Sequence, residues 1–438
     1  MKSLFFGGVH PADKKELSAN AELKTVKEPK QVTIPMSQHI GNPCEPLVAV
    51  GDTVKKGQKI GDGKGLCVPV HASVSGKVVA IEKRRHVNGR EVLSVVIEND
   101  YKDTEDTSMT AYEDYSKLSN DQIIDIIREA GIVGMGGATF ATNVKAATSM
   151  EKVKTLIANA CECEPYITVD YRECMENAEN ILGGVYLLAD LLQFKQVVIC
   201  VEDNKPKAIE VLKSIADKDL HEGNKVRLMT LKSKYPQGAE KMMVLSATGR
   251  VVPAGKLPAD AGCVVMNVGS VAFVNRYLTT GKPLTSRTVT VSGDCIKEPK
   301  NIRVPVGTSV HQIIDACGGF TKDPVKIIAG GPMMGKTMST LNTPITKNFS
   351  AFLALGEEGV SPEESACIRC GRCLRACPMG LAPAKMDALV RHGDYAGALA
   401  IGALNCMECG SCTYSCPAKR ELLQAIKVAK CIGGNIKA

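Results

Sequence analysis

The first strongly periodic segment of apolar residues predicts a helix near residue 120. Four isoleucines at positions 123, 124, 126 and 127 follow Ser119, and Gln122 stands three positions after that serine. A serine followed at this spacing by glutamine is the capping-box pattern of a helix start. The pattern therefore predicts an amphipathic helix that begins after Ser119 and ends at Gly131.

The next part of the chain alternates between two kinds of apolar pattern. Short apolar runs typical of strands lie at Thr155–Ala158, Val197–Val201 and Val226–Leu231, and a helical pattern such as Lys205–Ala216 lies between them. Strands that alternate with helices favour a layered α/β fold. Residues 106–284 are therefore predicted to form a Rossmann-like α/β domain.

Shorter strands broken by Gly and Pro occupy residues 30–105. Val50–Gln58 and Val70–Val78 resemble the hairpins of biotinyl and lipoyl domains, but His71-Ala72-Ser73 stands where those domains carry the modified lysine. The resemblance implies a β-sandwich, of the barrel-sandwich hybrid type, without a swinging arm. A structural or docking module is favoured over a covalent carrier, and residues 1–29 are assigned to an N-terminal extension.

A third pattern begins at residue 285. Arg287–Gly293 alternates like an exposed strand, Val304–Val306 can pair with it, and Ser309–Cys317 is helical in pattern. Two strands and a helix in so short a space resemble a β-grasp-like domain of the SLBB type, assigned to residues 285–352. In residues 353–438, the Ala-, Leu- and Met-rich segment 382–404 predicts helices. The whole chain is therefore expected to be a multidomain α/β protein.

The C-terminal segment repeats one cysteine motif. Cys367, Cys370, Cys373 and Cys377 precede Pro378, and Cys406, Cys409, Cys412 and Cys416 precede Pro417. This C-x2-C-x2-C-x3-C-P spacing is that of proteins with two [4Fe–4S] clusters, in which the fourth cysteine of each run ligates the other cluster. We expect Cys416 to join the first three cysteines, Cys377 to join the second three, and a helical dicluster ferredoxin domain to carry them.

Composition narrows the class of protein. The other ten of the 18 cysteines do not resemble a disulfide framework, which favours a reducing compartment. The net charge of +7, the absence of Trp and the 4% aromatic content do not support nucleic-acid binding. The sequence has no apolar run of the roughly 18 residues that a spanning helix needs, and no signal-peptide pattern. A soluble chain in the cytoplasm is expected.

Two segments carry candidate flavin chemistry. The loop with Gly134, Gly136 and Gly137 departs from the dinucleotide fingerprint at Thr139, yet its backbone could approach a phosphate that Lys145 neutralises. A purely structural turn is about as probable for such a loop. The second segment, Asn159 to Tyr166, follows a predicted strand, where open α/β sheets bind ligands.

That second segment offers several ligand groups. Asn159 can pair with the edge of a pyrimidine, and Glu162 and Glu164 can bind ribose hydroxyls or a carboxamide. A metal site at Cys161 and Cys163 is the weaker alternative, because two thiols are too few for a closed site.

These segments, with Tyr235-Pro236-Gln237-Gly238-Ala239-Glu240, resemble the three flavin motifs of the NADH-binding flavoprotein subunit of respiratory complex I. Their order, the sandwich before them, the cluster domain after them and the opening Phe6-Gly7-Gly8-Val9-His10-Pro11 resemble the RnfC family. Members of that family are the NADH- and FMN-binding dicluster subunits of the Rnf complexes, which are membrane-bound ferredoxin:NAD oxidoreductases. The resemblance covers nearly the whole chain.

The resemblance implies a set of cofactor-binding residues. It places non-covalent FMN at Gly134, Gly136, Gly137, Lys145, Asn159, Glu162, Tyr235, Gly238, Glu240 and Asn267, and NADH near Phe140, Glu164 and Tyr166. The chain departs from the complex I motifs at Met135, Cys161 and Ala239. No general acid or base is implied, because hydride transfer needs positioning rather than proton transfer.

The implied activity is electron transfer between NAD(H), FMN and two [4Fe–4S] clusters, within an ion-translocating complex that oxidises or reduces ferredoxin. The implied partners are the other Rnf subunits, including the membrane subunits and the ferredoxin-like subunit. The implied location is peripheral, on the cytoplasmic side of the membrane. Two alternatives remain open: the diaphorase subunit of a soluble hydrogenase or formate dehydrogenase, and a non-catalytic iron–sulfur adaptor.

Overall fold

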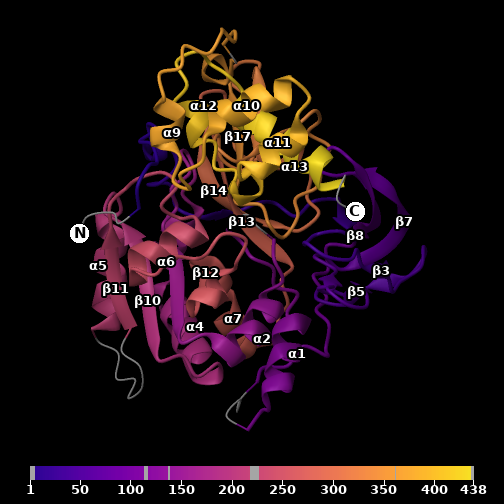
Figure 1. Ribbon diagram of the computed structural model, residues 1–438. Helices are drawn as coiled ribbons and strands as arrows, with labels where there is room; N and C mark the ends of the chain where they lie inside the picture. The colour runs from indigo at the N-terminus through magenta and orange to yellow at the C-terminus, as the bar shows by residue number, and fades with distance from the viewer. Residues whose placement is uncertain (1–4, 113–116, 137–138, 218–225, 361, 436–438) are drawn as a thin grey trace.

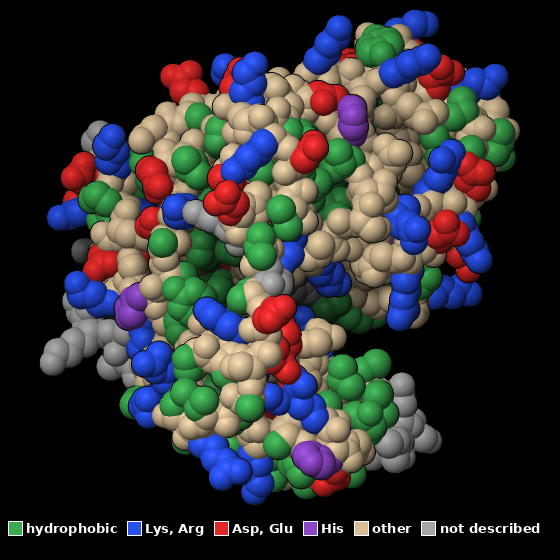
Figure 2. Space-filling view, turned by 90° about the horizontal axis from the view of Figure 1, so that it is seen from above, with side chains coloured by type: hydrophobic (Ala, Val, Ile, Leu, Met, Phe, Trp, Pro, Cys, Tyr) green, Lys and Arg blue, Asp and Glu red, His purple; other side chains and the backbone are tan. Residues whose placement is uncertain are grey.

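A computed structural model describes residues 5–112, 117–136, 139–217, 226–360 and 362–435. Its helical C-terminal part lies above a central sheet, with the α/β domain below on one side and the N-terminal sandwich on the other (Figure 1). A deep hollow separates two lobes in the view from above, where basic side chains are interleaved with acidic ones (Figure 2). The multidomain α/β fold predicted from the sequence is confirmed.

The sandwich consists of two antiparallel sheets. One has the order β2-β8-β7-β4 and the other β3-β5-β6. Their bounds are β2 Gln31–Pro35, β3 Glu45–Pro46, β4 Thr53–Val54, β5 Lys59–Asp62, β6 Val70–His71, β7 Gly76–Arg85 and β8 Glu91–Asn99. The predicted tip is buried, and Ser73 Oγ donates to Val306 O over 2.5 Å. At the position where lipoyl domains carry the modified lysine, this chain therefore contacts the domain of the central sheet.

The α/β domain begins with α1 (Asn120–Glu129), whose predicted capping box between Ser119 and Gln122 is present. Its four strands are parallel, in the order β11-β10-β9-β12. The strands are β9 Thr155–Ala160, β10 Gln196–Glu202, β11 Val226–Leu231 and β12 Cys263–Asn267. They are mostly apolar because helices cover a parallel sheet on both faces.

The helices of this domain are α2 Thr142–Lys152, α3 Val169–Glu176, α4 Ala178–Leu191, α5 Pro206–Ala216, α6 Glu240–Thr248 and α7 Val268–Thr280. The chain winds outwards from β9 through β10 to β11 and then returns to place β12 on the other side of β9. The strand order therefore reverses between β9 and β12. Ligands of open α/β sheets bind at such a switch point, outside the carboxyl ends of the strands.

A six-stranded sheet with the order β1-β14-β13-β17-β15-β16 forms the centre of the molecule. Its elements are β1 Lys24–Thr25, β13 Ser286–Ser292, β14 Lys300–Pro305, α8 Val310–Asp315, β15 Lys326–Ala329, β16 Lys336–Thr337 and β17 Ala351–Leu355. The expected pairing of the first two strands after residue 285 is found as the antiparallel pair β13–β14. The N-terminal extension adds β1 in parallel to β14, which the sequence did not predict.

The C-terminal part is helical, as predicted. It contains α9 Arg372–Ala376, α10 Pro383–Arg391, α11 Tyr395–Ala400, α12 Ser411–Tyr414 and α13 Leu422–Asn435. Buried Asp387 accepts from Arg391 and Arg420 and so ties α10 to the segment before α13. Short 3-10 turns lie at Lys15–Leu17, Pro258–Ala261, Glu357–Gly359 and Ala403–Asn405. Within the described ranges, no helix has the length and apolar character needed to cross a bilayer.

Candidate functional site

Two asparagines stand side by side at the switch point. Asn159 and Asn267 are register partners at the carboxyl ends of β9 and β12. Asn159 Nδ2 donates to Gly238 O over 2.8 Å, while Asn267 Nδ2 donates to Asp170 Oδ2 over 2.7 Å. Asn267 also caps α7, because its Oδ1 accepts from Gly269 N over 2.9 Å. The two amides are therefore held in place before any ligand arrives.

The glycine-rich loop lies over this pair. It is closed at its base, where Gly134 N donates to Phe140 O over 2.9 Å. Gly136 is exposed, and a side chain added there would meet the Asn267 side chain at 3.4 Å. Phe140 is half-buried, and Gly137 lies outside the described residues. The loop leads into α2, as expected from the sequence.

Lys145, in the first turns of α2, reaches back to the sheet. Its Nζ donates to Glu240 Oε1 and, over 3.0 Å, to Val265 O. An ammonium group has three protons to donate. Among the described residues these two acceptors are its hydrogen-bond partners, so one proton remains for a ligand oxygen. Lys145 and Glu240, both predicted from the sequence, are thus brought together.

Gly238 leaves no room for a side chain. A Cβ at this residue would stand 2.2 Å from Cys161 O, so backbone passes where a side chain would be. Gly238 N lies 3.4 Å from Cys163 Sγ and donates to it. Burial raises the pKa of Cys163, so the sulfur is a neutral thiol. In the structure, Cys161 and Cys163 therefore contact the backbone at Gly238.

The two carboxylates of the Asn159–Tyr166 segment have different surroundings. Glu162 Oε1 accepts from Asp170 N over 2.8 Å at the start of α3. Its buried Oε2 has no hydrogen-bond partner within the described part of the chain, although Lys15 Nζ lies 4.0 Å away. A buried carboxylate oxygen without a hydrogen-bond donor lowers the stability of the fold unless a ligand or another group supplies the donor.

Glu164 is held by a loop of the central sheet domain. Its Oε2 accepts from Met333 N over 3.1 Å and its Oε1 from Met334 N over 2.9 Å. A side chain at Gly331 would meet Glu164 Oε2 at 2.2 Å, so only glycine permits this approach. Burial raises the pKa of Glu164 from 4.5 to about 7, against the two amides, which lower it. The predicted NADH contact of Glu164 stays a prediction.

The other predicted NADH contact is also part of an interdomain contact. Tyr166 is buried and packs with Ile328, Leu353 and Leu355 of the central sheet. Its backbone N donates to Asp13 O over 2.7 Å. The contact of Tyr166 with NADH therefore also stays a prediction.

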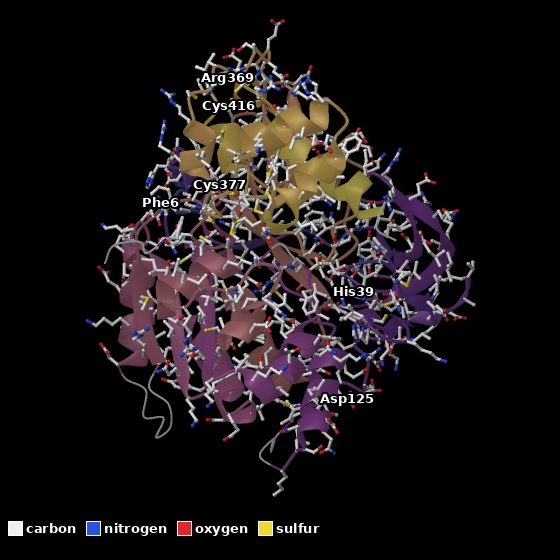
Figure 3. The ribbon with its side chains drawn as sticks, viewed as in Figure 1. Phe6, His39, Asp125, Arg369, Cys377 and Cys416 are labelled. Carbon is white, nitrogen blue, oxygen red and sulfur yellow. The ribbon has the colours of Figure 1, made fainter. Side chains whose placement is uncertain are left out.

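Tyr235 connects the flavin segment to the cysteine motifs. Its hydroxyl donates to Cys409 O over 2.7 Å, and its backbone pairs with Val9 in both directions. Gly8 N donates in turn to Ala376 O over 2.8 Å, and a Cβ on Gly7 would meet the Cys377 backbone at 2.8 Å. The N-terminal Phe-Gly-Gly-Val sequence thus lies between the flavin segment and the cysteine domain, beside Cys377 (Figure 3).

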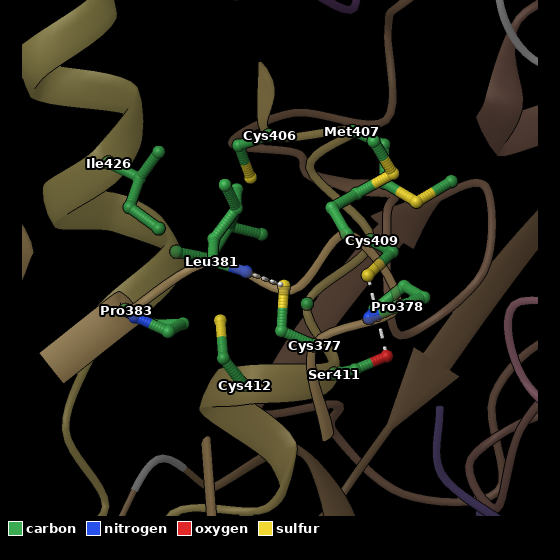
Figure 4. Close-up of a pocket in the computed structure, with 13 residues that line it drawn as sticks. Cys377, Pro378, Leu381, Pro383, Cys406, Met407, Cys409, Ser411, Cys412 and Ile426 are labelled. Carbon is green, nitrogen blue, oxygen red and sulfur yellow. Dashed lines mark hydrogen bonds between the residues drawn. The ribbon is translucent and has the colours of Figure 1, made fainter. Parts of the chain in front are cut away.

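Four thiols surround one cavity. Cys406, Cys409 and Cys412 come from the second cysteine run, and Cys377 comes from the first. Figure 4 shows their sulfurs facing a common space lined by Leu381, Pro383 and Ile426. Leu381 N donates to Cys377 Sγ over 3.4 Å, and Glu408 N to Cys406 Sγ over 3.3 Å. These four cysteines are the crossed set expected from the spacing. Among the described residues, no group of three or more His, Cys, Asp or Glu side chains is close enough together to hold a metal ion.

The other four cysteines lie further out. Cys367 and Cys370 are exposed, whereas Cys373 is buried in a small apolar cluster that Cys416 borders. Cys416 and Arg369 lie towards the outer end of the domain in Figure 3.

The two runs repeat one backbone conformation. Arg369 and Glu408 have φ of 55° and 61°, and Gly371 and Gly410 have φ of 70° and 77°. The same turn therefore presents the ligands of each run, and glycine is favoured at the positive-φ position next to the short helix.

Sequence reasoning missed several residues of the site. Lys15 is buried, and its Nζ donates to Glu164 O over 2.9 Å and to Ile167 O over 2.5 Å. Burial lowers the pKa of Lys15, while Glu162 opposes that shift. Burial also raises the pKa of Asp170, which lies beside Glu162. Lys15 stands in a polar N-terminal stretch without a motif, so no local pattern could have identified it.

The residues present fit a flavin phosphate and ring. Lys145, Asn159 and Asn267 each use part of their donor capacity on protein partners in the described ranges, which leaves an N–H on each. The adjacent glycine backbone is open to solvent at Gly136. Closely approaching backbone N–H groups and one cation are the donors that phosphate requires.

The fold and the site define a class: a flavin-binding α/β domain joined to a two-cluster ferredoxin domain. Residues 127–276 match the Nuo51 FMN-binding domain and residues 366–419 the 4Fe-4S dicluster domain. Residues 3–102 match the RnfC barrel sandwich hybrid domain and residues 288–337 the SLBB domain. FMN and two [4Fe–4S] clusters are thus the cofactors of this chain.

Full-length relatives identify the family. The chain is 46% identical over 434 residues to the C component of the proton-translocating ferredoxin:NAD(+) oxidoreductase complex of Clostridium ljungdahlii, covering 98% of this chain and 94% of the relative. It is 44% identical to the Na(+)-translocating counterpart of Acetobacterium woodii, covering 97% and 96%. The chain therefore belongs to the RnfC family, and the resemblance stated above is confirmed.

Solved structures agree on the fold alone. An NAD+-reducing [NiFe]-hydrogenase in the H2-reduced state matches with a TM-score of 0.53 at 18% sequence identity. The match covers 70% of this chain and 63% of that one. At such low identity the match supports a shared fold over that part of the chain and does not transfer an activity.

Proposed function

We propose that the chain is the NAD(H)-reactive electron-transfer subunit of an Rnf complex. In this role it exchanges electrons between NAD(H) and ferredoxin-dependent partner subunits while those partners move Na+ or H+ across the membrane. Its relatives of known name are components of such complexes. The single observation that carries the proposal is the direct contact between the flavin segment and one cysteine set, Tyr235 Oη to Cys409 O.

Bound FMN would supply the conversion between the two-electron chemistry of nicotinamide and the one-electron chemistry of iron–sulfur clusters. The chain contributes binding and orientation. Lys145 and the backbone at Gly136 would hold the phosphate, and Asn159 would hold the ring edge. Glu164 and Phe140 would contact the nicotinamide. None of these side chains needs to transfer a proton in hydride exchange.

The cysteine sets occupy unequal positions, and we propose that they act in sequence. The inner set is Cys377 with Cys406, Cys409 and Cys412, next to Tyr235. The outer set is Cys416 with Cys367, Cys370 and Cys373, of which Cys367 and Cys370 are exposed. Electrons would thus pass between the flavin and the inner set, and between the outer set and a partner protein. Peripheral attachment on the cytoplasmic side of the membrane is part of the same proposal.

Anaerobic reconstitution tests this order. The chain is loaded with iron, sulfide and FMN, and NADH is added while flavin and cluster absorbance are followed. Cys367→Ser should leave flavin bleaching and inner-cluster reduction intact but abolish reduction of an external one-electron acceptor. A chain that binds iron but no flavin would support the adaptor alternative instead. Co-purification with hydrogenase or formate dehydrogenase subunits, rather than with membrane subunits, would support the diaphorase alternative.

A further inference from the structure

A cavity of about 360 Å³ runs beside α7, between the α/β domain and the central sheet. Its lining includes buried Met135, half-buried Asn267 and Lys56, and exposed Lys282. Small-molecule pockets typically measure about 300–1,000 Å³. The cavity therefore has room for a ligand of nucleotide size.

Two of the arginines that line this cavity each have a buried nitrogen without a partner among the described residues. Arg287 is only 7% exposed, and its Nε has no hydrogen-bond partner in the described ranges, although another of its nitrogens donates to Phe349 O over 3.2 Å. Arg276 Nε also lacks an acceptor there. A buried donor without an acceptor is energetically unfavourable. Arg276 and Arg287 therefore bring guanidinium groups to the lining of the cavity, although their Nε atoms are themselves buried.

The charge of the lining is predominantly positive. Five basic residues face three acidic ones: Lys56, Arg276, Lys282, Arg287 and Arg303 against Glu105, Asp170 and Glu173. Glu105 is paired with Lys282 at 2.6 Å, and Glu173 with Arg276 at 3.4 Å. Asp170 accepts from an asparagine amide. The lining therefore has more guanidinium groups than carboxylates that are free to pair with them.

Guanidinium groups match phosphate oxygens in geometry as well as in charge, since two parallel N–H groups can bind two oxygens. The aromatic ring of Phe273 also lines the cavity, and Arg276 lies over it at 5.5 Å. A ligand with a phosphate and a planar ring could bind the guanidinium groups through its phosphate and pack its ring near Phe273.

We propose that this cavity is a second ligand site, separate from the flavin site, which binds a phosphorylated small molecule of nucleotide size through Arg276, Arg287 and Arg303. It is separate because Lys145, Gly238 and Glu240 are not part of its lining. Asn267 belongs to both sites and is the point where they meet. The proposal does not depend on the electron-transfer function proposed above.

The test uses the full chain loaded with FMN and clusters, with inorganic pyrophosphate as the probe in anaerobic calorimetry. The wild type should bind pyrophosphate, and Arg303→Gln should weaken binding by about tenfold or more, because the substitution removes a charged hydrogen bond to phosphate. The control is Arg84→Gln, an exposed arginine on β7 paired with Glu82. It should bind like the wild type, and all three proteins should hold the same amount of FMN.

Several results would overturn the proposal: no binding to the wild type, equal weakening by both substitutions, or displacement of the probe by excess FMN or NAD+. Displacement would assign the cavity to the flavin or nicotinamide site. If Arg303→Gln fails to fold, hydrogen exchange on the wild type decides. Pyrophosphate should then slow exchange in β13, β14 and α7, and unchanged exchange there would refute the site.

Discussion

Replacement of Glu164 by Gln tests whether this carboxylate is held, at a cost in stability, between two domains. In the folded chain its pKa is raised by burial from 4.5 to about 7. Below about pH 4.5 the carboxyl is protonated in both the folded and the unfolded state, so it imposes no penalty. As pH rises towards 7, the unfolded chain releases the proton before the folded chain does, and folding stability falls.

The size of the effect follows from that shift. A rise in pKa from 4.5 to about 7 predicts that the Glu164 penalty grows by about 2.5 kcal/mol between about pH 5 and about pH 8. The side chain keeps some contact with solvent, which screens the charge, so a growth of about 1–2.5 kcal/mol is expected. Glutamine carries no charge at any of these pH values. It also loses one of the two amide contacts, a cost of about 1–2 kcal/mol that does not vary with pH.

The assay is anaerobic urea unfolding of wild type and Glu164→Gln at several pH values from 5 to 8. The stability of the variant relative to the wild type should rise with pH. The control is Glu298→Gln at an exposed site, where a hydrogen bond from Lys300 lowers the carboxyl pKa. Its relative stability should fall, if it changes at all, as pH rises through the acid range. A Glu164→Gln difference that is flat or falls with pH would refute the buried-carboxylate reasoning.

Three further predictions concern the flavin segment and the inner cysteine set. Gly238→Ala should lower bound FMN at least tenfold, measured as flavin per chain, because a Cβ would stand 2.2 Å from a backbone oxygen. Gly249→Ala should keep its flavin, because its cost is backbone strain at φ 75° and its Cβ would meet no atom. Cys377→Ser should lower the iron content and the absorbance of the inner cluster, although Cys377 belongs to the first cysteine run. Cys431→Ser, at an exposed cysteine outside both runs, should change neither. Loss of the outer cluster alone would contradict the crossed set. Tyr235→Phe should destabilise the chain by about 1–3 kcal/mol in urea unfolding, because a buried carbonyl loses its donor. The same substitution should slow the reduction of the clusters by NADH more than the reduction of the flavin. Equal slowing of both steps would argue against a role for this contact in electron transfer.

Local sequence patterns determined the chemistry and the types of secondary structure. The cysteine spacing predicted the clusters, because each turn that presents three thiols is formed by consecutive residues. The capping box at Ser119 and the parallel strands were also predictable, since periodicity and end signals act over a few residues. The domain boundaries assigned from the sequence stay predictions.

Tertiary structure decided which of these parts meet. Glu164 contacts Met333 and Met334, and Tyr235 contacts Cys409, across more than 160 residues of chain. Such contacts depend on how separate domains pack, which periodicity and residue spacing do not encode. The same holds for β1, which joins the central sheet from the N-terminal extension. The sequence thus determined which cofactors the chain can hold, and packing decided which cysteine set faces the flavin segment and which faces outwards.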